Sequence, residues 1–287
     1  MTGSPEVSVV LRSRNDGGII GRTLAALRRQ TVPHEIVSLD NASSDDTRAV
    51  LTAHGVTVHD VPAGGYVPGR VLNRGVALAR ADVVAFVNSD CPPLHDDFLA
   101  RLVAPIRGGA ADATWGRQVP RPGASALTRL DHARMYGDTP PPASWGPRFS
   151  LAVSAIRRAL LRERPFSEEV QYSEDLEWVV AMLPRGLRVR YVPDARAEHS
   201  HEYSFGQAWK RFFEEGRADA AIFRDGGRPV APLRSALGLL RDVLRDAEEG
   251  LRAGEPGALA RSPFLRAAQR GGYLAGRLAG PRRDLGA

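Results

Sequence analysis

The stretch Val7-Ser8-Val9-Val10-Leu11-Arg12-Ser13-Arg14-Asn15-Asp16-Gly17-Gly18 decides the fold of this protein. Its first five residues form an apolar, mostly β-branched run that predicts a buried strand, and the Asn-Asp-Gly-Gly segment ends that strand. Ile20, Leu24 and Leu27 follow at helical spacing. Because a buried strand leads directly into an amphipathic helix, the opening predicts a βαβ unit and a parallel sheet.

The same alternation continues along the first half of the chain and becomes looser after residue 110. Residues 35–39, 56–58, 83–87, 113–118 and 187–192 are predicted strands, and residues 69–80, 96–106, 173–183 and 205–223 are predicted helices. The chain after residue 232 is predicted to be helical, with a break at 254–257. We therefore expect an α/β fold whose mostly parallel sheet has flanking helices, followed by a C-terminal helical extension.

Composition limits the function without choosing it. The 287 residues are 43% hydrophobic, which suffices for a large core, and carry a net charge of +6, with Lys210 as the only lysine. Such a basic chain suits nucleic acid, an anionic membrane surface or phosphorylated small molecules, although a genomic composition bias would give the same arginine excess. The single cysteine, Cys91, rules out an intramolecular disulfide, and no apolar run reaches membrane-spanning length. We expect a cytoplasmic protein, or one peripheral on the inner face of the plasma membrane.

Polar residues gather just beyond the ends of the predicted strands. Arg14 and Asn15 follow the first strand, Asp40 ends the second, and Asp90 follows residues 83–87. Open α/β sheets bind ligands at the carboxyl ends of their strands, so this edge is the predicted binding site. Asp45 and Asp46 come after Asp40 but have a sufficient structural explanation as first-turn acids of a helix.

Two further clusters could carry chemistry. Ser173-Glu174-Asp175 opens a predicted helix; Ser173 fits an N-cap, and the two acids either complement the helix dipole or act as a general base pair. His199 and His201 are alternate residues of an extended segment and point the same way, so both could reach one metal ion or phosphate. Asp90, at a strand tip, is either a turn acid or a ligand that holds a divalent cation against a diphosphate.

Taken in order, these segments resemble the inverting family 2 glycosyltransferases of the GT-A fold, and more closely their bacterial rhamnosyltransferase-like members. The resemblance covers about residues 7–225. It is carried by the opening strand, by the Asp40 segment Leu39-Asp40-Asn41-Ala42-Ser43-Ser44-Asp45-Asp46-Thr47 and by the Arg-Asn-x-Gly helix Gly69-Arg70-Val71-Leu72-Asn73-Arg74-Gly75. Asn88-Ser89-Asp90 stands at the D-x-D position, and Glu174-Asp175 at the E-D position. The two closing motifs are Trp115-Gly116-Arg117-Gln118-Val119-Pro120-Arg121-Pro122 and His199-Ser200-His201-Glu202-Tyr203-Ser204-Phe205.

The resemblance implies a domain division and a reaction. Residues 1–225 would form the GT-A domain, with a nucleotide-binding half to about 110 and an acceptor-binding half from 111, and residues 226–287 a helical extension. The enzyme would transfer a sugar from a UDP-, dTDP- or GDP-sugar to a glycan, lipid-linked or small-molecule hydroxyl. Asp175 would be the base, kept ionised at neutral pH by the helix N-terminus, with Glu174 beside it.

The resemblance also assigns the remaining site residues. Mn²⁺ or Mg²⁺ would be held by Asp90, His199 and His201, although Asn88 replaces the first acid of the metal motif. Trp115, Arg117 and Gln118 would contact the acceptor. The nucleotide sugar would contact Ser13, Arg14, Asn15, Asp40, Arg70, Asn73, Ser89 and Asp90.

The C-terminal extension adds two partner hypotheses. Leu233, Leu237, Leu240 and Leu244 form one helical stripe flanked by arginines. Such a helix either lies on an anionic membrane or packs on the catalytic domain, and we favour packing. A homodimer is a further hypothesis.

Three competing functions make different demands on the sequence. A sugar nucleotidyltransferase needs a glycine-rich phosphate loop with a lysine, and Gly17-Gly18 is too short for one. A nucleic-acid-binding protein needs interleaved basic and aromatic residues on one surface, whereas here the arginines are scattered. A non-catalytic sugar-nucleotide binder would not need the Glu174-Asp175 pair.

Overall fold

A computed structural model describes residues 4–61, 66–223 and 232–281 of the chain. The chain forms two compact units. The first unit comprises Met1–Arg121 and Met135–His199, and the second Pro122–Arg134 and Ser200–Ala287. The division expected near residue 225, between a GT-A domain and a helical extension, stays a prediction.

The first unit is built on one seven-stranded sheet of order β3-β2-β1-β4-β6-β5-β7. Its strands are β1 (Val7–Ser13), β2 (His34–Asp40), β3 (Val58–Asp60), β4 (Val83–Val87), β5 (Ala113–Val119), β6 (Val153–Arg157) and β7 (Val189–Glu198). Only β6 runs antiparallel to its neighbours, β4 and β5. The structure therefore confirms the predicted α/β class with a mostly parallel sheet.

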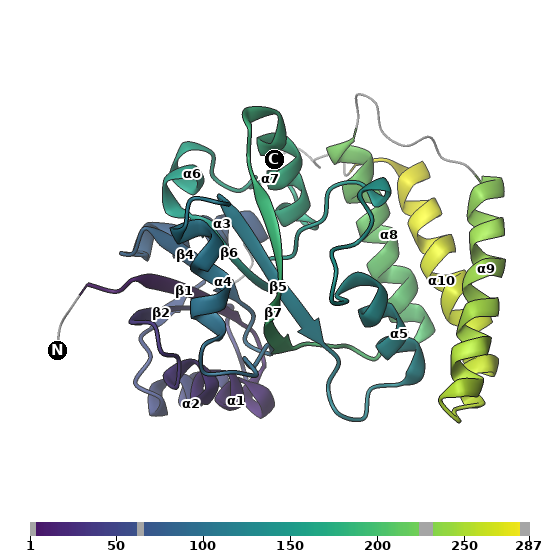
Figure 1. Ribbon diagram of the computed structural model, residues 1–287, viewed down its shortest axis with the longest axis horizontal. Coiled ribbons are helices and arrows are strands. Elements are labelled where there is room, and N and C mark those ends of the chain that lie inside the picture. The colour runs from purple at the N-terminus through teal and green to yellow at the C-terminus, as the bar shows by residue number, and fades with distance from the viewer. Residues whose placement is uncertain (1–3, 62–65, 224–231, 282–287) are drawn as a thin grey trace. The chain divides into compact units, whose positions relative to one another are not determined.

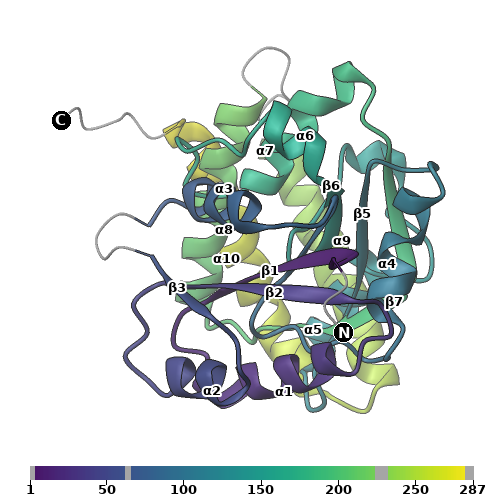
Figure 2. The ribbon, with the colours of Figure 1, turned by 90° about the vertical axis from the view of Figure 1, so that its left-hand side faces the viewer.

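Helices cover both faces of this sheet, as the two-residue period of buried strands requires. Val7, Val9 and Leu11 of β1 pack against α1 (Gly17–Arg28), α2 (Thr47–Ala53) and α4 (Phe98–Arg107). Val10 faces the other way, toward α3 (Pro68–Leu78), α6 (Arg158–Glu163) and α7 (Glu174–Met182). Figure 2 shows α1 and α2 on one side of β1 and β2, and α3 on the other.

The sequence patterns missed β6, α6 and the helix α5 (Ala126–Met135). The strand β6 is only five residues long and passes directly into α6, so it has no turn signal at its end. The helix α5 buries only Ala126 and Leu127 and has no apolar stripe. The strand β7 continues six residues past its predicted end, and the register of its pairing with β5 shifts between Gly116 and Arg117. This longer strand carries the chain to His199.

The second unit contains α5, α8 (Phe205–Ile222), α9 (Pro232–Arg252) and α10 (Gly257–Ala279). Figure 1 shows α10 between α8 and α9. The helices α8 and α10 approach closely at Gly276. A Cβ atom there would lie 2.0 Å from the carbonyl oxygen of Phe213, so a glycine is needed at this position. Among the described residues, no helix is long and apolar enough to span a membrane.

The leucine stripe of α9 is not buried within the helical unit, and its packing on the catalytic domain stays a prediction. Leu237, Leu240 and Leu244 are 58–62% exposed, and Leu233 lies outside the residues whose side chains are described. Among the side chains of α9 that the structure describes, Asp242 and Asp246 are buried.

Candidate active site

The tips of β1 and β2 are joined through the carboxylate of Asp40. The parallel register places Asp40 beside Ser13, whose Oγ donates a hydrogen bond of 3.0 Å. Ser43 donates from its Oγ at 2.6 Å and its N–H at 3.0 Å, and Arg48 Nη1 donates at 3.1 Å. Burial raises the pKa of Asp40, but these donors outweigh burial and hold the pKa below its ordinary value. The side chain of Asp40 has no exposed surface, so its contact with a nucleobase stays a prediction.

The turn after β1 holds two residues in unusual conformations. Asn15 and Ala42 have positive φ values of 56° and 49°. Asn15 Oδ1 accepts a hydrogen bond of 2.8 Å from the Ser44 N–H, and the Asn15 N–H donates to Ser43 Oγ at 2.9 Å. Non-glycine residues in this region are strained and cluster at functional sites. Arg14 and Asn15 are exposed at this edge of the sheet, where a nucleotide could reach them.

Asp45 has the structural role that its position suggested. Its carboxylate accepts hydrogen bonds from the N–H groups of Gly17 and Thr47 at 2.9 and 3.0 Å. Asp45, rather than Ser44, thus satisfies the start of α2 and ties it to the start of α1.

Ser89 connects the tip of β4 to the turn after β1. Its Oγ donates a hydrogen bond of 2.6 Å to Asp16 Oδ2, and its carbonyl oxygen accepts one of 2.7 Å from Thr23 Oγ1. Because Ser89 is buried, these contacts support a positioning role, and its contact with a sugar nucleotide stays a prediction.

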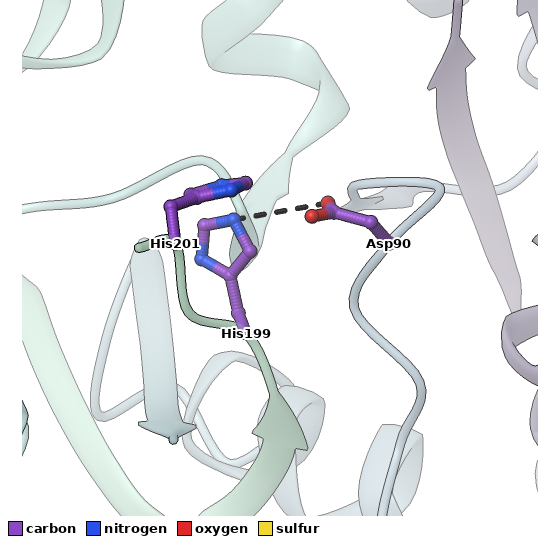
Figure 3. A group of neighbouring side chains, drawn as sticks. All are labelled: Asp90, His199 and His201. Atoms are coloured by element: carbon purple, nitrogen blue, oxygen red, sulfur yellow. Dashed lines mark ion pairs between the residues drawn. The ribbon is translucent and has the colours of Figure 1, made fainter. Parts of the chain in front are cut away.

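Asp90 and His199 meet because the segment after β4 pairs with the end of β7. The Leu94 N–H donates to the carbonyl of Arg196, and the Glu198 N–H donates to that of Pro92. His199 Nε2 then lies 3.7 Å from Asp90 Oδ1, as Figure 3 shows. This separation is too long for a hydrogen bond but suits two ligands of one metal ion.

His201 follows two residues later along the chain. One ligand atom from each of Asp90, His199 and His201 lies within 4.8 Å of the other two. The sequence predicted these three metal ligands, and the local geometry is compatible with them. Two imidazoles and one carboxylate suit Mn²⁺ better than Mg²⁺, which prefers oxygen ligands.

The ring of His199 is held by a buried glutamine. Gln118 Oε1 lies 2.6 Å from His199 Nδ1, and Gln118 Nε2 donates to Ser150 Oγ at 2.9 Å. A glutamine oxygen can only accept, so the contact places the histidine proton on Nδ1. The lone pair of Nε2 then points toward Asp90, which is how protein histidines are prepared to bind metals.

Arg121 is a site residue that the sequence-based assignment omitted. Its Nη2 donates hydrogen bonds of 2.8 Å to both the carbonyl oxygen and Oδ2 of Asp90. The guanidinium fixes this carboxylate and adds positive charge beside the predicted diphosphate position. The sequence held one indication of this role, because Arg121 belongs to the Trp115–Pro122 motif that resembles the family's.

The start of α7 differs in detail from the prediction. Ser173 is at the N-cap position, but its φ is 59° and its side chain makes no capping hydrogen bond. The predicted N-cap position of Ser173 is therefore confirmed, although its hydroxyl makes no capping hydrogen bond. The left-handed residue instead turns the chain sharply so that Glu174 and Asp175 enter the site together.

Arg12 bonds Glu174, whereas Asp175 is held by backbone N–H groups. Its Nη1 donates a hydrogen bond of 3.1 Å to Glu174 Oε1, and both side chains are mostly buried. Asp175 accepts from the N–H groups of Leu151 and Leu176 at 3.2 and 2.8 Å. In the sequence, a role for Arg12 in the site is indicated by its charge, since it directly follows an apolar strand.

Asp175 stays mostly ionised at neutral pH as expected, but its pKa is raised rather than held low by the helix N-terminus. Burial, followed by the nearby charge of Glu174, raises the pKa of Asp175 to about 6. The two backbone donors and Arg12 oppose this rise without cancelling it. The carboxylate remains mostly ionised at pH 7, but its proton affinity is much closer to that of an efficient general base than an exposed aspartate's.

Arg70 and Asn73 of α3 hold the loop that leads to α7. Asn73 exchanges two hydrogen bonds of 2.9 Å with the backbone of Phe166, and Arg70 pairs with Glu168 at 3.2 Å. A Cβ atom on Gly69 would lie 1.9 Å from the Ser167 carbonyl oxygen, so only glycine allows this approach. These contacts support an anchoring role, and contact of Arg70 and Asn73 with the nucleotide stays a prediction.

The three residues predicted to bind the acceptor have different surroundings. Trp115 is 4% exposed and packs on Tyr191 with ring centroids 4.4 Å apart, and Gln118 is buried as described above. Arg117 is partly exposed and pairs with Asp138. Of the three side chains, only that of Arg117 is exposed enough to reach an acceptor, and contact with the acceptor stays a prediction for all of them.

Comparison with known sequences identifies the family. The model of "Glycosyl transferase family 2" matches residues 8–163, which is more than half of the chain. The O-antigen chain rhamnosyltransferase RfbN of Salmonella typhimurium LT2 is 24% identical over 74% of this chain and 71% of its own length. The rhamnosyltransferase WbaN of Salmonella anatum is 25% identical over 67% of this chain and 64% of its own length.

Solved structures share the fold at low identity. The mannosyltransferase PcManGT of Pyrobaculum calidifontis, determined with GDP-Man and Mn²⁺, has a TM-score of 0.62 and 21% identity, and covers 93% of this chain and 74% of its own. Glucosyl-3-phosphoglycerate synthase of Mycobacterium tuberculosis, determined with Mn²⁺, UDP-glucose and phosphoglyceric acid, has a TM-score of 0.56 and 21% identity, and covers 77% and 79%.

These matches decide among the functions that the sequence left open, in favour of glycosyl transfer over nucleotidyl transfer and nucleic-acid binding. The order of strands and helices is that of the GT-A fold. The chain belongs to glycosyl transferase family 2 and is a glycosyltransferase that resembles bacterial rhamnosyltransferases.

Proposed function

We propose that this enzyme transfers a sugar with inversion from a nucleoside diphosphate sugar to a hydroxyl acceptor, and that Asp175 is the catalytic base. The observation that carries the proposal is the environment of Asp175. It is a half-buried carboxylate with a pKa of about 6, next to a second carboxylate that is already paired with Arg12.

The reaction would be a single displacement. Asp175 takes the proton from the acceptor hydroxyl, and the acceptor oxygen forms a bond to the anomeric carbon. The bond from that carbon to the diphosphate oxygen breaks, and the nucleoside diphosphate leaves with the electron pair. One attack from the face opposite the leaving group inverts the anomeric centre. Glu174, held by Arg12, would position the acceptor.

Asp90, His199 and His201 would hold a divalent cation, with Mn²⁺ favoured over Mg²⁺ by the two imidazoles. When bound, the cation supplies positive charge that neutralises the leaving diphosphate. Arg121 adds charge at the same place, since it bonds Asp90 directly. Gln118 orients His199 from behind.

The relatives support a substrate class. Two are named O-antigen chain rhamnosyltransferases, so a deoxyhexose donor and a glycan or lipid-linked acceptor are the first to test. Such an acceptor would bring the enzyme to the cytoplasmic face of a membrane. A panel of UDP-, dTDP- and GDP-sugars, screened by thermal shift with and without Mn²⁺, would identify the donor.

The base assignment is tested with Asp175→Asn. We expect transfer to fall by at least about 10³-fold while donor affinity changes little, because the amide keeps the shape but cannot accept the proton. Glu169→Gln, an exposed acid in the preceding loop, is the matched control and should retain activity. Full transfer activity in Asp175→Asn would refute the assignment.

The metal site is tested by Mn²⁺ binding in the absence of substrate, followed by electron paramagnetic resonance. Asp90→Ala and His199→Ala should each weaken binding at least about 10-fold, because each removes one ligand. His59→Ala, on the distant edge strand β3, should bind Mn²⁺ like the wild type. Unchanged binding in both site variants would exclude this metal site.

A further inference from the structure

The helix α9 turns two aspartates inward and four leucines outward. Leu237, Leu240, Leu244 and Leu251 are 58–64% exposed, whereas Asp242 and Asp246 on the opposite side are buried. Exposed apolar stripes of this kind on a folded protein mark interaction surfaces. The question is which partner covers the stripe.

Ion pairs inside the helical unit fix the orientation of α9. Asp246 accepts hydrogen bonds from Ser262 Oγ at 2.5 Å and Arg266 Nε at 2.6 Å, both on α10. Asp242 accepts one of 3.0 Å from Arg270 Nε. Breaking such a buried pair is strongly destabilising, so α9 cannot rotate to bury its leucines. The side of α9 away from α10 is therefore a stable surface (Figure 1).

The four exposed leucines and the partly exposed Ala247 follow the spacing of a coiled-coil seam. Leu237, Leu240, Leu244, Ala247 and Leu251 are separated by three, four, three and four residues, which are successive a and d positions of a heptad. Arg241 and Glu248 then occupy the two e positions beside the seam.

The charges on the e positions select the orientation of the partner helix. In an antiparallel pair, e positions face e positions, so Arg241 of one chain meets Glu248 of the other, twice by symmetry. In a parallel pair, e positions face g positions, which here are the uncharged Ala236, Val243 and Gly250. Glu248 also pairs with Arg252 of its own chain at 2.6 Å, but of the two orientations only the antiparallel one brings Arg241 beside an acid.

We propose that α9 pairs antiparallel with α9 of a second copy of this chain. In this register, Leu240 packs on Leu251 of the partner subunit, and Leu244 packs on Ala247 of the partner subunit, with the ion pairs at the edges. The central layers then match a large side chain with a small one, and the outer layers pair leucine with leucine. The short contact predicts a dimer that dissociates on dilution.

The charge of α9 favours a second copy over a membrane surface. The helix carries four arginines and four acids, so its net charge is zero, and it contains no aromatic residue. Helices that lie on anionic membranes have an excess of basic residues and often aromatic anchors.

Charge reversal tests the pairing by sedimentation of the whole protein. Arg241→Glu and Glu248→Arg should each weaken dimerisation about 3–10-fold, because each places like charges together. The double variant should restore the wild-type dimer. Glu249→Arg, which lies outside the seam at an f position, is the matched control and should leave the dimer unchanged.

Leu244→Glu should abolish the dimer and leave the melting temperature of dilute, monomeric protein unchanged, since the leucine is exposed in one chain. A wild-type protein that stays monomeric at all concentrations would overturn the proposal, as would a double variant that fails to recover. Leucine-dependent binding of a monomer to vesicles of anionic lipid would assign the stripe to a membrane instead.

Discussion

Arg12 on β1 and Glu174 at the start of α7 form an ion pair, with Nη1 and Oε1 3.1 Å apart, although 162 residues separate them in the chain. Burial lowers the pKa of Arg12, but Glu174, Tyr66 and Asp175 together raise it above the ordinary value, so the guanidinium stays charged. One buried cation thus allows two adjacent carboxylates to share the site. This arrangement leads to the first prediction.

The rate of transfer should depend on pH through Asp175. The base must be ionised, and its pKa is about 6, so kcat/KM should be constant above pH 7 and fall about tenfold per pH unit below 6. Arg12→Gln removes a charge that lowers the pKa of Asp175, and the midpoint should move to higher pH. Arg29→Gln, an exposed arginine at the end of α1, should leave the midpoint in place. The profiles of the three proteins provide the check, and an unmoved midpoint in Arg12→Gln would contradict the proposed coupling.

The same carboxylate should reduce the stability of the fold at neutral pH. Its pKa is raised from 3.8 to about 6 by folding, so the native state holds the proton where the unfolded chain has lost it. The contribution of Asp175 to the free energy of unfolding is therefore fully present below pH 4 and is lost as pH rises through 6. Asp175→Asn resembles the protonated acid at every pH and avoids this loss.

Melting temperatures across pH 4 to 8 measure this effect. The variant should match the wild type near pH 4 and melt roughly 2–4 °C higher at pH 7 for each kcal/mol recovered. A difference that stays constant with pH would mean that ionisation of Asp175 does not oppose folding.

Gln118 should act on metal binding through His199. Gln118→Leu keeps the buried volume but removes the acceptor for Nδ1, so Mn²⁺ affinity should fall about 10–100-fold. Gln118→Glu retains an acceptor oxygen and should recover most of that affinity. Titration with Mn²⁺ measures the difference without substrate, and equal affinity in a folded Gln118→Leu protein would limit the residue to a packing role.

Gly69 should be intolerant of even one methyl group. Gly69→Ala would press its Cβ on the Ser167 carbonyl and displace the loop that carries the chain to Glu174. We expect lower stability, by about 1–3 kcal/mol, and lower kcat. Gly18→Ala in α1 is the control, because its Cβ would meet nothing within 4 Å and should stabilise the helix slightly. Denaturant unfolding of both variants compares the two positions, and equal stability would show that the loop yields easily.

The local patterns identified single elements well and their geometry poorly. The apolar run at 83–87 and the strand β4 coincide, because a buried central strand needs an unbroken apolar run. The helix α5 could not be found in this way, since its ion pairs to Glu255 and Arg266 replace an apolar stripe. Ser173 resembled an N-cap in sequence, but its backbone angle depends on the surrounding chain.

What the sequence by itself determined is the α/β class and the edge of the sheet where the candidate site residues Asp90, Glu174, Asp175 and His199 lie, because periodicity and strand ends are local properties. Tertiary structure decided the surroundings of each of these side chains. Only folding buries Asp175 and raises its pKa, pairs Glu174 with Arg12, and sets Gln118 behind His199. Each of these effects arises from charges and dipoles brought within a few ångströms across long separations in the chain, where burial strengthens them.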